Sequence, residues 1–279
     1  MSRYYYLVSG LPDLQLDKPV RKINFEEVYL QITENLTPED REKLNYLVLR
    51  NDVVNFLQAL SEKRGEASHY LSWQAPALLS PEIIEHFLRN SDSFPVFMQE
   101  LLHEHPDWLD DRSLKDIESW LWKAYYTNGL EKHEGFIAKY LAFELNLRNI
   151  LLAYNARNYQ INLKEQLIAD ADINRLLLRS QAADFGLARE YPFMENLQLT
   201  FADKDPVKIE KTIDKIKWQY IDELTAFSFF DIDTVLGYFL KMQIVQRWNI
   251  YPETENAKTH VKALSEKILE GFKLPEIFN

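Results

Sequence analysis

The chain has 279 residues, of which 46% are hydrophobic, none is cysteine and only 7 are glycine, and its formal net charge is −11. The lack of cysteine excludes disulfides, thiolate nucleophiles and Cys-based metal sites, and the acidic balance argues against a nucleic-acid partner, which requires a basic surface. Scarce glycine disfavours the Gly-rich loops that hold phosphate groups, and no such motif occurs in the sequence. The composition therefore favours helices joined by short polar loops.

The N-terminal stretch "RYYYLVSGLPDLQL", residues 3–16, is unusually apolar. It does not match a signal peptide, and no later stretch reaches the roughly 18 apolar residues of a membrane span, so we expect a soluble chain. A run of this length cannot be assigned to a strand or a helix by its periodicity. In either case we expect Tyr4–Val8 to be buried, packed against the equally apolar C-terminal stretch "GFKLPEIFN", because dense exposed apolar patches are uncommon.

Helix start signals recur along the rest of the chain, each a capping side chain followed by proline or by acidic residues. They occur at Thr37-Pro38, Ser80-Pro81, Ser113 with Asp116, and Asp205-Pro206. Together with apolar spacing of helical period, they predict helices near residues 25–35, 38–60, 81–90, 94–104, 113–127, 135–156, 162–168, 171–185, 206–225, 232–249 and 256–271. The stretch "EYPFMENLQLTF", residues 190–201, is the one candidate for a short extended segment.

A weak internal repeat runs through three of these helices. Arg50, Arg148 and Arg247 are spaced 98 and 99 residues apart, close to a third of the chain. A second register pairs polar residues within the same helices, and its spacings are 94 and 97: Asp52 with Asn55, Asn146 with Asn149, and Gln243 with Gln246. Packing alone does not favour polar pairs midway along apolar helices, and we expect the amide of Asn149, which lies among leucines and isoleucine, to be hydrogen-bonded to a neighbouring segment.

Two Glu-x-x-His motifs, Glu66 with His69 and Glu100 with His103, have the spacing of two-metal carboxylate helix bundles. Such a site also needs carboxylates from other helices, for which Glu118 or Glu144 would be candidates. The alternative is that the histidines are surface or capping residues, because residues 63–76 resemble a loop and His103 lies at a helix end. No nucleophile motif such as G-x-S-x-G is present.

A basic stripe lies along one predicted helix of this acidic chain, at Lys204, Lys208, Lys211 and Lys215. It would suit an acidic partner. The alternative is a solvated face, because Glu210 and Asp214 are interleaved with the lysines.

The stretch "FELNLRNILLAYNARNYQINLKEQLI", residues 143–168, resembles the central-stalk subunit of V-type and archaeal-type rotary ATPases, called C in prokaryotes and d in eukaryotes. Glu144, Asn149 and Arg157 match the polar positions of that family. Asp52 and Asn55 look like a first copy of the pattern, and Gln243 and Gln246 like a degenerate last copy. The start "YYYLVSGLPDL" is similar to that of a bacterial family encoded beside V-type ATPase subunits.

This resemblance implies an all-α fold in a single body, with three similar helical segments, approximately 1–93, 94–190 and 191–279, arranged as a funnel about a pseudo-threefold axis. It implies a non-catalytic rotor subunit that joins the membrane rotor ring to the central shaft during ion transport. No cofactor, metal or nucleic acid would bind. The protein would be cytoplasmic and peripheral to the membrane only through its complex. The alternatives are a helical adaptor outside any ATPase and a metal-dependent carboxylate-bundle enzyme.

Overall fold

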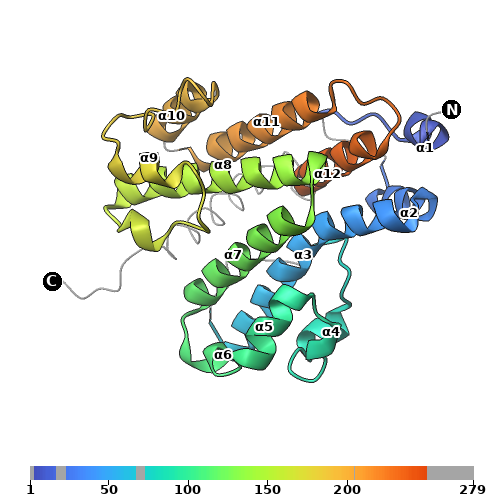
Figure 1. Ribbon diagram of the computed structural model, residues 1–279, viewed down its shortest axis with the longest axis horizontal. Coiled ribbons are helices and arrows are strands. Elements are labelled where there is room, and N and C mark those ends of the chain that lie inside the picture. The colour runs from blue at the N-terminus through green and yellow to red at the C-terminus, as the bar shows by residue number, and fades with distance from the viewer. Residues whose placement is uncertain (1–2, 17–22, 67–72, 204, 250–279) are drawn as a thin grey trace. The chain divides into compact units, whose positions relative to one another are not determined.

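A computed structural model of the chain describes residues 3–16, 23–66, 73–203 and 205–249. Over these ranges the fold is all-α, with twelve α-helices, two short 3-10 turns and no strand. Figure 1 shows the elements in chain order. The predicted helix over 256–271 and the C-terminal stretch "GFKLPEIFN" lie outside the described residues. None of the described helices is long and apolar enough to cross a membrane.

Internal contacts divide the chain into two compact units. The first comprises residues 1–37 and 175–279, and the second comprises residues 38–174. These boundaries do not coincide with those of the three predicted quasi-repeats, which stay a prediction, as does the pseudo-threefold axis.

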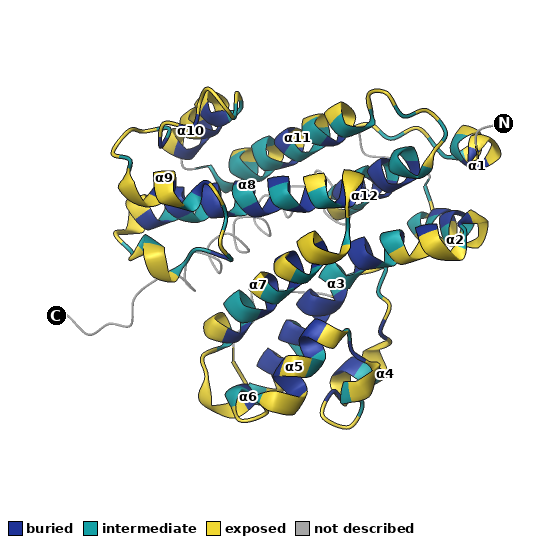
Figure 2. Cartoon of the chain, in the orientation of Figure 1, coloured by how far each residue is buried: buried dark blue, intermediate teal, exposed yellow. Residues whose placement is uncertain are grey.

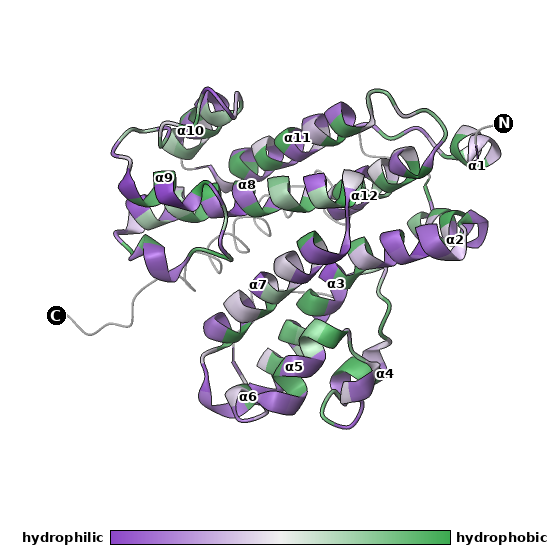
Figure 3. Cartoon of the chain, viewed as in Figure 1, coloured by the Kyte–Doolittle hydropathy of each residue, from purple (hydrophilic) through white to green (hydrophobic). Residues whose placement is uncertain are grey.

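The second unit is organised around three long helices and the shorter elements between them. They are α3 (Pro38–Arg64), α4 (Pro81–Glu85), η1 (Ser91–Ser93), α5 (Val96–Glu104), α6 (Trp108–Asp111), α7 (Leu114–Lys132), α8 (Gly135–Tyr159) and η2 (Leu163–Glu165). Helix α7 packs against α3, α5 and α8, so it lies at the centre of the unit. Figures 2 and 3 show buried, hydrophobic residues concentrated along α3 and α5.

Aromatic side chains from several helices fill the core of this unit. The ring of Phe56 on α3 lies 5.1 Å from that of Phe87 and 5.8 Å from that of Phe94. Tyr46 stacks on Tyr125 at 5.3 Å and donates its hydroxyl to the Tyr125 carbonyl. Each of these rings is at most 6% exposed. Burying one such side chain stabilises the fold by about 1.5–3 kcal/mol, so this cluster holds α3 against α7 and the α4–α5 segment.

The first unit contains α1 (Tyr5–Gly10), α2 (Phe25–Asn35), most of α9 (Asn174–Arg179), α10 (Met194–Asp203), α11 (Pro206–Thr225) and α12 (Ile232–Asn249). Helices α11 and α12 lie side by side, α10 packs on α11, and α2 packs on α12. The chain's start is fixed to this unit by two hydrogen bonds, from Tyr4 N to the Phe230 carbonyl (3.1 Å) and from the Tyr238 hydroxyl to the Pro12 carbonyl (2.9 Å).

Three predicted helix starts are confirmed by their capping bonds. The Ser80 hydroxyl accepts from Ile83 N at 3.3 Å, and the Ser113 hydroxyl accepts from Asp116 N at 3.2 Å. The Asp205 carboxylate accepts from Val207 N at 3.0 Å, with Pro206 at the first helical position. These side chains satisfy backbone donors that a helix leaves unpaired, which is why the signal can be read from sequence.

The expected burial of Tyr4–Val8 is wrong in part. Tyr4 and Leu7 are 4% and 6% exposed, whereas Tyr5 and Tyr6 are 45% and 77% exposed. The segment forms α1, and a surface helix buries only the side chains three or four residues apart on one stripe. A continuous apolar run on such a helix therefore leaves some of its side chains exposed to solvent.

The region around α9 and α10 differs from the sequence prediction. Residues 194–203 are helical, not extended, because Met194, Leu197 and Phe201 recur at helical spacing and are all buried. The helix predicted over 171–185 spans only Asn174–Arg179. The chain then turns at Asp184, whose carboxylate accepts from Gly186 N and Ala188 N.

Candidate functional site

The side-chain amide of Asn55, in the middle of α3, binds the backbone of the loop that follows this helix. Its Nδ2 donates to the Gln74 carbonyl at 3.0 Å, and its Oδ1 accepts from Gln74 N at 2.7 Å. An amide side chain carries one acceptor and two donors, so it can satisfy both polar groups of one backbone residue. We call this arrangement an Asn clamp.

Asn149 on α8 forms a second Asn clamp. Its Nδ2 donates to the Ile168 carbonyl and its Oδ1 accepts from Ile168 N, both at 2.9 Å. A further bond joins its Nδ2 to the side chain of Asn174 at 3.0 Å. Asn149 is fully buried, and the predicted hydrogen bonding of this residue is confirmed.

The two Asn clamps match each other in sequence spacing as well as in bonding. In each, the clamped residue follows the asparagine by 19 positions, and the asparagines are 94 residues apart. This is the spacing of the second register in the sequence. Residues 55 and 149 therefore occupy like surroundings in α3 and α8.

Asp52 lies one turn before Asn55 and binds the same loop. Its fully buried carboxylate accepts from Leu78 N at 3.1 Å and from Leu79 N at 3.0 Å. Burial raises the pKa of Asp52 to about 6, although both backbone bonds act to lower it. Asp52 and Asn55 together hold this loop, residues 74–79, against α3.

Arg50 and Glu144 connect α3 with α8. Arg50 Nη1 lies 3.7 Å from Glu144 Oε1, and Glu144 is 3% exposed. The Glu144 carboxylate raises the pKa of Arg50. Burial and the same carboxylate raise the pKa of the nearby Tyr126 hydroxyl, which keeps it neutral. Arg157, the third position of the resemblance, is exposed about two turns beyond Asn149 and so lies apart from this buried group.

The two later arginines of the first register, Arg148 and Arg247, pack against the preceding long helix. Arg148 lies over the ring of Trp122 on α7 at 4.1 Å, while Arg247 on α12 forms an ion pair with the buried Asp214 of α11. Trp122 and Asp214 are each the ninth residue of their helices. Trp248 Nε1 also donates to the Asp214 carboxylate, at 2.6 Å. The pair α7 and α8 and the pair α11 and α12 therefore resemble each other: in both, an arginine of the later helix contacts the ninth residue of the earlier one.

The last copy of the polar pair, Gln243 and Gln246, lies on α12 and is half-buried. Nε2 of Gln243 is buried and has no hydrogen-bond partner in the part of the chain that the structure describes. The residue 19 positions after Gln246 lies outside the described residues. The structure therefore leaves the third copy of the clamp as a prediction.

The predicted basic stripe is only partly available to a partner. Lys208 pairs with Asp203 at 2.9 Å, and Lys211 lies 5.7 Å above the ring of Trp248. Lys215 is exposed, and Lys204 lies outside the described residues. Two of the four lysines, Lys208 and Lys211, therefore already contact side chains of the chain itself.

The candidate metal ligands do not gather into one cluster. Over the described ranges, no group of three or more His and acidic side chains is placed to hold a metal ion. Glu66 pairs with Arg64 at 3.4 Å, and His69 lies outside those ranges. His103 is exposed and lies 3.3 Å from the Asp92 carboxylate.

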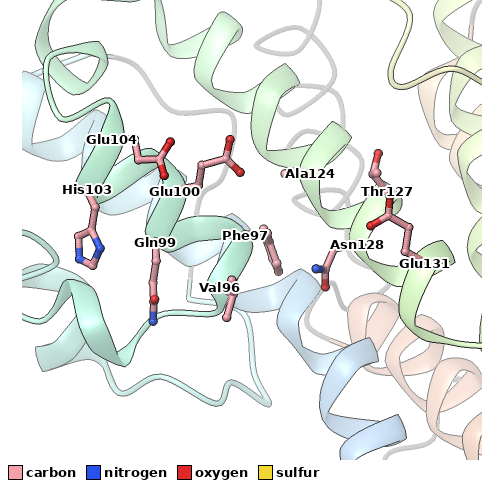
Figure 4. A pocket seen from close by; sticks show the side chains of 10 residues that line it. All are labelled: Val96, Phe97, Gln99, Glu100, His103, Glu104, Ala124, Thr127, Asn128 and Glu131. Atoms are coloured by element: carbon pink, nitrogen blue, oxygen red, sulfur yellow. The ribbon is translucent and has the colours of Figure 1, made fainter.

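A groove of about 550 Å³ lies between α5 and α7. Figure 4 shows the side chains that line it, with Val96 and Phe97 between the two helices and acidic side chains around them. Glu100 and His103, the second Glu-x-x-His pair of the sequence, both line this groove. Sequence reasoning missed the groove, because its walls come from helices that are brought together only by folding.

Comparison with known proteins assigns the chain to a protein family. A family model described as "Protein of unknown function (DUF2764)" matches residues 1–271. No curated protein and no solved structure matches the chain. Since the match spans nearly all of its residues, the chain belongs to the DUF2764 family.

Proposed function

We propose that the chain is a non-catalytic central-stalk subunit of a V-type ATPase or ATP synthase, joining the membrane rotor ring to the central shaft. The observation that carries this proposal is the pair of Asn clamps, in which residues 94 apart make the same bonds to backbone 19 positions later. Recurrence at about a third of the chain length accords with the resemblance of Asp52, Asn55, Glu144 and Asn149 to the polar positions of the stalk subunit.

The bonding pattern also suits a part that transmits torque. A body that must turn without yielding needs its helices and loops fixed in register. The Asn clamps fix loops to α3 and α8, while the Arg50–Glu144 pair joins these helices to each other. These buried polar contacts stabilise one arrangement of neighbours, because breaking any of them leaves unpaired groups.

In this role the chain needs no cofactor and performs no reaction of its own. Its partners would be the rotor ring and the shaft, and it would meet the membrane only through them, on the cytoplasmic side. The net charge of −11 accords with protein rather than nucleic-acid partners.

Reconstitution from purified parts tests the proposal. The full-length chain is mixed with the rotor ring in detergent and with the shaft subunits of a V-type ATPase from the same genome, and complexes are separated by size-exclusion chromatography. We expect one copy of the chain to co-elute with the ring and with the shaft. A folded chain that binds neither would overturn the proposal and favour the helical adaptor outside any ATPase.

A further inference from the structure

The groove between α5 and α7 has an apolar centre. Val96, at the first residue of α5, is 68% exposed, so this branched apolar side chain stands in solvent at the groove. The ring of Phe97 and the methyl group of Ala124 from α7 also line it. Phe97 is itself only 5% exposed and packs edge-on against Tyr125 at 6.2 Å, which fixes this wall of the groove to the core.

The charged residues around this centre are all of one sign. Glu100 and Glu104 come from α5 and Glu131 from α7, and Figure 4 shows Glu100 and Glu104 projecting from the same side of α5. None of the ten lining residues is lysine or arginine. The side chains of the three glutamates form no ion pair or hydrogen bond within the described ranges of the chain. Like charges four residues apart on a helix repel, so Glu100 and Glu104 lack compensation in the free chain.

We propose that this groove docks a basic amphipathic helix of a partner protein. The apolar seam of that helix would cover Val96 and Phe97, and lysine or arginine on both sides of the seam would meet the three glutamates. A helix laid in a groove is a recurrent recognition mode, and charge complementarity sets its orientation. Helix α5 has 9 residues, so a partner helix of about three turns would span the groove.

This inference rests on the groove alone and does not depend on the proposed role in a rotary ATPase. It can be tested without ATPase subunits, with a fluorescein-labelled peptide made of three Leu-Lys-Lys-Leu-Leu-Lys-Leu heptads. Binding to the full-length chain is followed by fluorescence anisotropy at 150 mM salt. The groove variant is Glu100→Gln/Glu104→Gln/Glu131→Gln. The matched control, Glu42→Gln/Glu85→Gln/Asp110→Asn, removes the same charge from exposed positions outside the groove.

We expect the groove variant to bind the peptide about tenfold more weakly than the control variant, since three exposed charge pairs together have about that effect. A second variant, Val96→Asp, separates docking in the groove from general attraction to an acidic protein. It removes the apolar contact but adds a negative charge, so docking predicts weaker binding and general attraction predicts tighter binding.

Equal losses in the groove and control variants would overturn the proposal, as would a Val96→Asp variant that binds the peptide as tightly as the unmodified chain. Circular dichroism of each variant verifies that the helical fold is kept. Because Val96 and the glutamates are exposed, we expect these spectra to be unchanged.

Discussion

Buried amide and carboxyl side chains bind two long helices of the second unit, α3 and α8, to the loops that follow them. Asn149 is fully buried and satisfies both backbone groups of Ile168. Its loss would leave a donor and an acceptor without partners in a place that water does not reach. The effect of such residues on stability therefore comes from the groups they satisfy.

Asn149→Leu should destabilise the fold by about 1–3 kcal/mol for each backbone group left unpaired. The matched variant Asn55→Leu removes the equivalent bonds to Gln74 and should have a similar effect. Urea denaturation gives both free energies of unfolding, with Asn158→Leu, an exposed position on α8, as the control. A stability of the Asn149 variant equal to that of the control would show that the clamp has no energetic role.

Asp52 makes a prediction about pH. Its pKa is about 6 in the folded chain and 3.8 in the unfolded one. At pH values between these two, Asp52 is mostly protonated in the folded state and mostly ionised in the unfolded state. This group therefore favours folding more at pH 4.5 than at pH 7, by about 2 kcal/mol, and the difference approaches about 3 kcal/mol below both pKa values.

Comparison with Asp52→Asn isolates this contribution, since asparagine does not titrate. Measured in urea at both pH values, the stability of the unmodified chain minus that of the variant should increase as the pH falls. A difference that stays constant or decreases would mean that the Asp52 carboxyl is not destabilised by burial.

Single residues could be predicted from the sequence where the local pattern was informative. Asn149 lies among leucines and isoleucine, so its burial and hydrogen bonding followed from its neighbours. Its partner Ile168 could not be named, because nothing local in the sequence identifies which loop residue returns to a helix. The same holds for the pairing of Arg50 with Glu144, two residues from different helices.

At the scale of elements, the close approach of three helices depends on one glycine. Gly129 on α7 lies where a Cβ atom would be 2.6 Å from Cε1 of Tyr46 on α3 and would also overlap Leu141 on α8. The hydroxyl of Tyr46 in turn donates to the Tyr125 carbonyl. Any side chain at position 129 must therefore displace a ring that is packed and hydrogen-bonded.

Gly129→Ala should lower the free energy of unfolding by about 1–3 kcal/mol, although alanine favours helices more than glycine does. Gly10→Ala is a suitable comparison, because there an added Cβ would meet only Gln31, at 3.4 Å. Thermal and urea unfolding measure both. A more stable Gly129 variant would mean that α3, α7 and α8 are packed less closely than the structure shows.

Helix positions could be predicted wherever a capping residue and a long apolar stripe coincide, as at Ser113 before α7 and Asp205 before α11. Short elements were harder. The sequence predicts a possible extended segment over residues 190–201, because the aromatic and polar residues at 190–193 obscure the helical period of α10, which begins at Met194. Helix α1 is too short to have a recognisable period.

For the whole molecule, the chain forms two compact units, and the second contains both described Asn clamps. The all-α class followed from scarce glycine and repeated caps, and the structure confirms it over the described residues. The groove between α5 and α7 could not be predicted, since Val96 and Glu131 have no sequence pattern in common.

The central proposal is that this chain is a rotor subunit between the membrane ring and the shaft. Electron cryo-microscopy of the V-type ATPase purified from its native membrane through a tag on this chain would test it most directly. We expect one copy per complex, located between the rotor ring and the central shaft, with helices α3, α8 and α12 related by rotation about the shaft axis. A complete ATPase in which this position is filled by another subunit, or purification of the tagged chain without any ATPase subunit, would contradict it.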